Sequence, residues 1–323
     1  MAYDDPQLVH LDSMLTNISV GYENNDFISE ILFPSVPVNK QSDKYFVHEK
    51  TGFTPLDDIR APKTQANEIP PRTLSRDSYY AEEHALVDLV SPQEIANADA
   101  GLEPLMESTE EVTATILLNR ENAAQTLART AANYDTGHTV TLAGTDQWSD
   151  PASTPIADLK AARDQIHSAI YRKPNVAAMG YQVFTQLEDH ADFIERIKYS
   201  QRGITTAEIV AAVVDIPRIV VAGAVKNTAN VGQAITTSYL WGKDVIIAHA
   251  DQPGRRKPVY GAEFTWRYRP AGGAVMPTER WFDDDLEAWK IRVRRAYDFK
   301  LLAVDAVATG QSVAGYLIVN AVA

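Results

Sequence analysis

The sequence predicts an α+β fold, because helical stretches and apolar strands both occur in its 323 residues. The clearest helix lies over residues 103–132, where apolar side chains recur at helical spacing. The clearest strand lies over residues 286–304, LEAWKIRVRRAYDFKLLAV, where apolar and basic residues alternate. Hydrophobic residues make up 45% of the chain, which is enough for a substantial core.

The first 44 residues are predicted to form an extended arm. Residues 15–50 hold many apolar side chains without a sustained helical or strand period, and Pro34 and Pro37 lie in their middle. Proline keeps such a segment extended and unsuited to a central strand. We expect the apolar side chains of the arm to be too many to stay exposed on a lone subunit: Phe27, Ile28, Ile31, Leu32 and Phe33.

Residues 45–88 are predicted to form a long projecting hairpin. Two extended runs, KYFVHE and RDSYYAEEHALVDLV, flank a polar connection with four prolines. A structureless loop of that length is unusual inside a compact domain. Neither face of the second run is cleanly apolar: Tyr80, Glu82 and His84 alternate with Tyr79, Ala81 and Glu83. Because an isolated ribbon is weak, we expect it to rest on another part of the protein.

Helix signals begin at Ser91, which is predicted to be an N-cap with Pro92 at the first helical position and Glu94 completing a capping box. The helix over 103–132 follows and spans ~45 Å at ~1.5 Å per residue. Its predicted buried stripe is Val112, Ile116, Ala123 and Leu127, with Glu110, Arg120 and Glu121 outside. A further helix, 155–171, carries the stripe Ile156, Leu159, Ala162, Ile166 and Ile170.

Strands are predicted from apolar, β-branched runs in the rest of the chain. These runs are NVAAMG, DIPRIVVAGAV, SYLWGKDVIIAHA, VYGAEFTWRYRP and the final GYLIVNAVA. A helix is expected over 181–189, directly after the first of them. The last run is apolar, so we expect it to be held in a sheet rather than frayed.

Composition excludes several classes of function. The chain has no cysteine, which excludes disulfides and thiolate-ligated metals. It has 30 basic and 43 acidic residues, a formal charge of −13, which is unsuited to gripping nucleic acid through its phosphates. We see no secretory signal and no apolar run long enough for a membrane helix, and we predict no membrane partner and no cofactor.

No catalytic motif is present. The seven histidines are scattered, and no nucleophile elbow, phosphate loop or zinc motif occurs. The acidic run Asp283–Asp285 with Glu287 allows a metal site and, as an unlikely alternative function, a metal-dependent hydrolase. A solvated or interfacial turn is favoured because calcium-loop spacing is missing. Four tryptophans of the C-terminal half are interpreted as core or interface anchors: Trp241, Trp266, Trp281 and Trp289.

The order of these segments resembles the major capsid proteins of tailed bacteriophages, which have the Hong Kong 97-type fold. The resemblance covers nearly the whole chain, and none of its motifs is catalytic, so we expect no enzyme. It is carried by LTNISVGYENNDFISEILFPSVPVNKQSDKYFVHEK, HADFIERIKYSQRGITT, SYLWGKDVIIAHA, EFTWRYR and RRAYDFKLLAVDAVATGQSVAGYLIVNAVA.

The resemblance implies a division of the chain that periodicity does not give. Residues 1–44 would be the N-terminal arm and 45–88 the extended loop. Residues 89–150 and 258–305 would form the peripheral domain, with the helix over 103–132 as its spine. Residues 151–257 and 306–323 would form the axial domain. Deletion of 1–35 is then expected to leave a soluble, folded subunit that does not close shells.

The resemblance also implies a function and partners. Hexamers and pentamers would build an icosahedral shell around double-stranded DNA, without sequence-specific binding, in a virion assembled in the host bacterial cytoplasm. A separate scaffolding protein, a portal and a decoration protein are the expected partners. No residues match the cross-linking pair of some relatives, so we expect noncovalent assembly. The alternative is an encapsulin-like compartment, which is distinguished by enclosing an enzyme.

The predicted subunit-interface residues come from the arm, the loop and the acidic run. The basic residues of the loop are expected to meet acidic neighbours. The full set is Phe27, Ile31, Leu32, Phe33, Tyr45, Phe46, Arg60, Lys63, Arg72, Arg76, Tyr79, Tyr80, Trp281, Asp283, Asp284 and Asp285.

Overall fold

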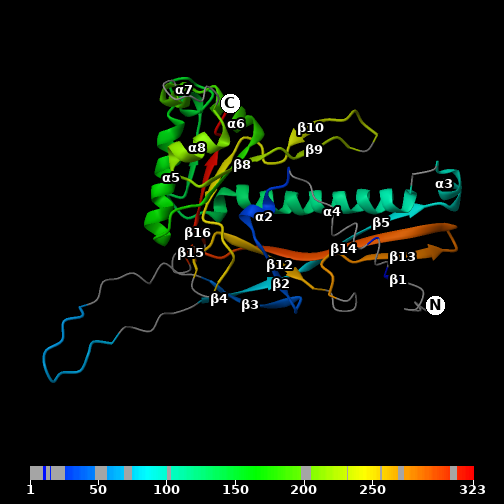
Figure 1. The fold of residues 1–323 in the computed structure, drawn as a ribbon, viewed down its shortest axis with the longest axis horizontal. Helices are drawn as coiled ribbons and strands as arrows, with labels where there is room; N and C mark the ends of the chain where they lie inside the picture. The colour runs from blue at the N-terminus through cyan, green and yellow to red at the C-terminus, as the bar shows by residue number, and fades with distance from the viewer. Residues whose placement is uncertain are drawn as a thin grey trace.

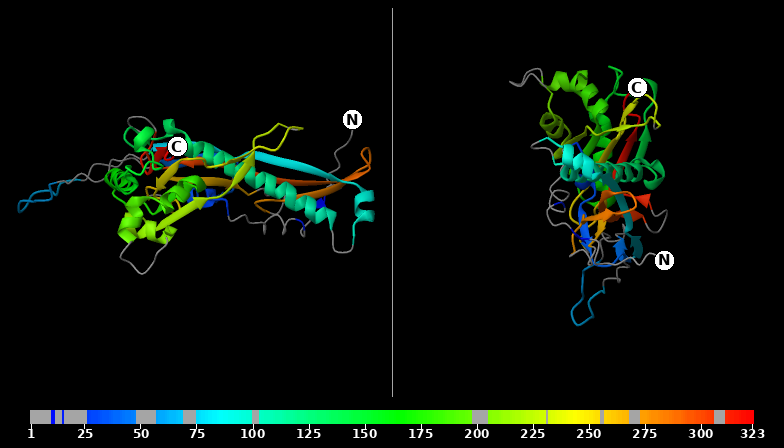
Figure 2. Two further views of the ribbon diagram at one scale, coloured as in Figure 1. Left: turned by 90° about the horizontal axis from the view of Figure 1, so that it is seen from above. Right: turned by 90° about the vertical axis from the view of Figure 1, so that its right-hand side faces the viewer.

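The computed structural model shows an elongated molecule. One part of the molecule contains a sheet surrounded by several helices. A long helix with a second sheet extends from this part in one direction, and a loop projects in the opposite direction (Figures 1 and 2). The residues that the structure describes are 10–11, 15, 26–47, 57–68, 75–99, 103–197, 205–230, 232–254, 257–267, 273–305 and 311–323.

The larger sheet is organised around one long strand. Its strand order is β1 (His10–Leu11), β13 (Thr278–Asp283), β14 (Ala288–Leu301), β12 (Gly261–Trp266) and β2 (Ser35–Val38), with β5 (Glu82–Val90) also pairing with β14. The first half of β14 pairs with β13 and its second half with β12, while β5 pairs along the other side. The alternation predicted for β14 is confirmed, because Ile291 and Val293 are buried.

The second sheet has the order β6 (Thr139–Thr141), β17 (Gly315–Val319), β11 (Val245–Ala248), β7 (Val176–Gly180) and β8 (Arg218–Ala222). The helices α5 (Pro155–Ile170), α6 (Tyr181–Glu188), α7 (Ala191–Ile197) and α8 (Ala207–Val214) lie around it. The predicted stripe of α5 is entirely buried, as expected. The C-terminal run lies inside the sheet, and its Leu317 and Ile318 are fully buried.

Two helices follow the main hairpin. In α3 (Pro92–Asn97) the predicted capping box is present: Ser91 Oγ accepts from the Glu94 N–H at 3.2 Å, and the Glu94 carboxylate accepts from the Ser91 N–H at 2.7 Å. The long helix α4 (Pro104–Arg129) lies across one face of the larger sheet, over β5 and β14 (Figures 1 and 2). Its predicted phase is wrong at Arg120 and Glu121, which are buried, because both side chains have buried polar partners.

The predicted projecting hairpin is formed by β3 (Ser42–Val47) and β4 (Ser75–Tyr80), which pair antiparallel. It rests on β12, where the Tyr79 ring stacks on Phe264 at 4.6 Å and Tyr45 lies 5.2 Å from the same ring. The second predicted run is not one strand. It breaks at the fully buried Ala81, and β5 leaves the hairpin to join the larger sheet.

Smaller elements complete the fold. A second hairpin, β9 (Val225–Asn227) and β10 (Thr237–Tyr239), leaves the second sheet and runs out above α4 in Figure 1. The arm contains the short helix α2 (Ser29–Leu32), and β15 (Val304–Asp305) pairs with β16 (Gln311–Ser312). No helix among the described residues is long and apolar enough to cross a membrane.

Candidate functional site: surfaces for subunit contact

The acidic run forms the turn between β13 and β14. The Asp283 carboxylate pairs with Lys290 and accepts from the N–H groups of Asp285 at 3.0 Å and Leu286 at 3.2 Å. The Lys290 hydrogen bond is the main reason why the pKa of Asp283 lies below its ordinary value. Asp284 and Asp285 are exposed. Within the part of the chain that the structure describes, no three acidic or histidine side chains come together as a metal site.

The arm does not leave its apolar side chains exposed, which corrects the sequence expectation for Ile28, Leu32 and Phe33. All three are buried in the core of their own chain. The Phe33 ring lies 5.3 Å from the rings of Tyr260 and Phe299. The physical reason is that β2, directly after Phe33, pairs in parallel with β12 as an edge strand, where proline is tolerated. The partly buried Phe27 and Ile31 pack against the same core.

A buried carboxylate joins the arm to both halves of the molecule. Glu121 of α4 is fully buried and accepts from the N–H groups of Ile28 at 2.9 Å and Ser29 at 3.1 Å. It also accepts from the Trp241 indole N–H at 2.8 Å. Because carboxylates stabilise free N–H groups at a helix start, Glu121 holds α2 in place while it contacts the residues before β11.

A second buried carboxylate lies between two arginines. Glu263 of β12 is fully buried and accepts from Arg120 at 2.9 Å and 2.5 Å and from Arg295 at 3.0 Å. Burial raises the pKa of Glu263, but the charges and hydrogen bonds of Arg295 and Arg120 outweigh it, so the net pKa is lowered. Arg120 also pairs with the exposed Glu30 of α2 at 3.2 Å. This network therefore ties the arm, the long helix and the larger sheet together.

The projecting loop, residues 57–68, exposes one large apolar side chain, that of Ile59. Ile59 is 83% exposed, and residues 57–68 around it are all exposed. Local hydrogen bonds shape the loop, including Arg60 Nε to the Thr64 carbonyl at 2.6 Å. Lys63 lies here too, with a positive φ of 67°. At the loop base, the Arg76 guanidinium lies 5.1 Å from the Phe46 ring centre. Arg72 lies outside the described residues.

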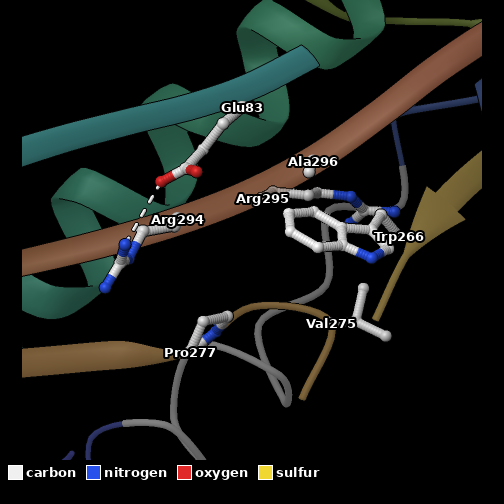
Figure 3. Close-up of a pocket in the computed structure, with 7 residues that line it drawn as sticks. All are labelled: Glu83, Trp266, Val275, Pro277, Arg294, Arg295 and Ala296. Carbon is white, nitrogen blue, oxygen red and sulfur yellow. Dashed lines mark hydrogen bonds and ion pairs between the residues drawn. The ribbon is translucent and has the colours of Figure 1, made fainter. Parts of the chain in front are cut away.

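The larger sheet exposes apolar side chains along one of its strands. Its strand β5 exposes Val87 and Leu89, which are 47% and 48% exposed. Beside them on β14, cations pair with acids of neighbouring strands, including Arg294 with Glu83 at 3.3 Å (Figure 3). Arg292 lies 4.9 Å from the Trp281 ring centre on β13. Sequence reasoning identified β5 as extended but missed this exposed apolar row.

Two hollows border these surfaces. A cavity of about 10 Å³ lies beside the Glu83–Arg294 ion pair (Figure 3), with room for no more than a water molecule. A groove of about 470 Å³ lies at the base of the projecting loop. It is lined by Tyr45, Val47, Ser75, Arg76, Asp77, Leu127, Phe299, Lys300, Leu301 and Val304.

The predicted interface residues therefore lie in three separate places, and the structure does not bring them together as one site. The arm residues lie against the core, and the loop residues surround the projecting hairpin. Trp281 and the acidic run lie at the far end of β13, away from the loop (Figure 1). Tyr79 is buried beneath the hairpin, whereas Tyr80 is 55% exposed.

Comparisons with known proteins agree with this architecture. The family described as phage major capsid protein E matches residues 131–218. The chain is 29% identical to the major capsid protein of Pseudomonas phage JBD67, over 83% of this chain and 86% of the relative. It is 27% identical to the major capsid protein of Burkholderia phage BcepMu, over 95% of both chains.

Solved structures show the same fold. A phage-related protein from Bordetella bronchiseptica RB50 superposes with a TM-score of 0.74 at 24% identity, over 96% of this chain and 97% of that one. The capsid of cyanophage P-SCSP1u gives a TM-score of 0.57 at 10% identity, over 92% and 89%. The fold is thus the Hong Kong 97-type capsid fold. The resemblance to phage major capsid proteins is confirmed, and these similarities support a structural role in a capsid shell.

Proposed function

We propose that this chain assembles as hexamers and pentamers into an icosahedral shell around the double-stranded DNA of a tailed bacteriophage. The observation that carries the proposal is the projecting loop. Residues 57–68 extend away from the body (Figures 1 and 2), and Ile59 at 83% exposure is not covered by its own chain. Long loops that project from a compact body are usually functional segments, and we infer that this one contacts another molecule through its exposed side chains. Both phage relatives are major capsid proteins.

The chemistry of the chain fits enclosing DNA rather than binding its sequence. A formal charge of −13 disfavours tight phosphate contacts. The proposal includes assembly in the host bacterial cytoplasm with a scaffolding protein, a portal and possible decoration of the outer surface by another protein. It also includes the division into a peripheral domain, residues 89–150 and 258–305 with α4 as its spine, and an axial domain, residues 151–257 and 306–323.

The proposed subunit contacts use the loop and the far end of β13. In the loop, Arg60, Lys63, Arg72 and Arg76 would meet acidic neighbours. Each exposed ion pair contributes ~0.2–1 kcal/mol, and repetition over many identical contacts makes the sum large. The arm contributes through its partly buried Phe27 and Ile31, since Leu32 and Phe33 already lie in the core of their own chain.

Electron microscopy of the purified chain, expressed alone and with its assembly partners, tests the proposed function. Closed icosahedral shells containing DNA are expected in the presence of the partners. Shells that contain an enzyme in place of DNA would establish the encapsulin-like alternative. A monomer under all conditions would contradict shell formation.

Replacing residues 57–68 with a short Gly-Ser linker is expected to abolish shells while the subunit stays folded. These residues are exposed, so their removal uncovers no core. Circular dichroism should give a melting temperature close to that of the unchanged chain, and electron microscopy should show no closed particles. The matched control replaces only 64–66 at constant length, which keeps Ile59, Arg60 and Lys63, and it should form closed shells. Shells at normal yield from the first variant would show that the loop does not mediate assembly.

A further inference from the structure

The β9–β10 hairpin carries two exposed apolar side chains, one at its base in β9 and one in the connection before β10. Ile235 is 78% exposed and Val225 is 50% exposed. The hairpin runs outward above α4, in the angle between α4 and the second sheet (Figure 1). Among the described residues the two strands pair only with each other, so neither outer edge is joined to another strand. Edge strands of this kind are templates for contact with another chain.

The hairpin is held in shape before any partner binds. The Asn227 side chain accepts from the N–H groups of Ala229 at 3.0 Å and Thr236 at 3.2 Å. Lys226 donates to Asn122 of α4 at 3.0 Å, which fixes the base of the hairpin against the long helix. A surface that is ordered in advance loses less entropy on binding. The hairpin therefore has an ordered surface on which another chain can bind.

The charge pattern indicates the partner. Residues 227–242 contain no charged residue, although 23% of the whole chain is charged. Two copies of this chain carry −13 each and repel one another, so a contact between them is favoured where the surface is neutral. We propose that the β9–β10 hairpin is a self-association element that docks on a second copy of this chain, with Ile235 as its apolar anchor. This inference rests on the proposed shell function.

Substitution of Ile235 tests the anchor. With Ile235→Asp we expect the yield of closed shells to fall by about tenfold or more, since a tenfold loss in affinity corresponds to only ~1.4 kcal/mol. The melting temperature of the subunit should not change, because the side chain is 78% exposed. Ile235→Leu keeps the apolar anchor and should assemble normally. Normal shell yield from Ile235→Asp, under conditions where the unchanged chain forms shells, would overturn the inference.

A cross-linking experiment identifies the partner independently of yield. The chain has no cysteine, so Ile235→Cys introduces its only thiol, which can be labelled with a maleimide benzophenone. Irradiation of assembled particles should link this chain to a second copy, as mass spectrometry would show. Links to a scaffolding or decoration protein, or no links in intact shells, would overturn the proposal. Failure of the unchanged chain to form any shell would instead refute the proposed function.

Discussion

Deletion of residues 1–35 is expected to unfold or aggregate the subunit. The deleted segment contains Ile28, Leu32 and Phe33, each at most 1% exposed. Removing one such side chain typically costs ~2–5 kcal/mol, so three together approach the ~5–15 kcal/mol that stabilises an ordinary domain. The deletion also removes the N–H groups of Ile28 and Ser29 that satisfy Glu121. This expected outcome differs from the one predicted from the sequence, which was a folded subunit that fails only in assembly.

Thermal melting and gel filtration of two truncations check this result. The full deletion should lack a cooperative melting transition or appear in aggregates. The matched truncation of 1–14 keeps Leu15, which is buried, and loses only β1 among the described residues, so it should melt close to the full chain. The single change Phe33→Ala should lower the free energy of unfolding by ~3–5 kcal/mol. A cooperative transition at the normal temperature after deletion of 1–35 would show that the arm is not part of the core.

Features that depend on neighbouring residues could be predicted from the sequence. The capping box at Ser91, the stripe of α5 and the alternation of β14 are local patterns with a fixed period. The docking of the arm could not be predicted in this way. It depends on β2 pairing with β12, where Ser35 lies opposite Glu263 across more than two hundred residues of sequence. Nothing within the arm itself indicates that partner.

The error at Arg120 and Glu121 has a different cause. Val112, Ile116 and Arg120 are spaced by four residues, so Arg120 occupies the same face as the buried stripe. Arg120 was predicted to be exposed because charged side chains prefer solvent, but a buried counter-ion allows a charged side chain to be buried. The helical spacing of these residues was the signal that could have indicated the burial of Arg120. Its partners Glu263 and Arg295 belong to distant strands, and sequence spacing does not show that they meet.

The β9–β10 hairpin lies mostly between two runs interpreted as single strands, DIPRIVVAGAV and SYLWGKDVIIAHA, and overlaps only their adjoining ends. The run SYLWGKDVIIAHA contains Gly242, which has a positive φ of 57° and ends the first extended segment. The chain then restarts as β11 at Val245. Apolar composition on both sides of the glycine concealed the break. The exposed Ile235 lies between the two runs and so was not assigned to any strand, whereas Leu240 and Trp241 within the second run are buried.

Glu263→Ala is expected to lower the free energy of unfolding by ~3–5 kcal/mol, because breaking a buried ion pair leaves its partner charge uncompensated. Here two partners remain. Arg120 and Arg295 are at most 6% exposed, and both bond to Glu263. Without it they face each other, and only the exposed Glu30 stays near Arg120. Urea unfolding at pH 7 measures the loss. The control Asp43→Asn removes the exposed Lys40–Asp43 pair and should change the free energy of unfolding far less than Glu263→Ala does, because exposed ion pairs are screened by solvent.

The difference in unfolding free energy between the unchanged chain and Glu263→Ala should depend on pH. Because the pKa of Glu263 in the folded state lies below its ordinary 4.5, its stabilisation is complete above pH 4.5 and is lost as the pH falls through the lowered value. The difference in unfolding free energy between the unchanged chain and Glu263→Ala should therefore be constant near neutrality and shrink in acid. A difference that is small at pH 7, or that grows as the pH falls below 4.5, would mean that the two arginines do not hold Glu263 as a carboxylate.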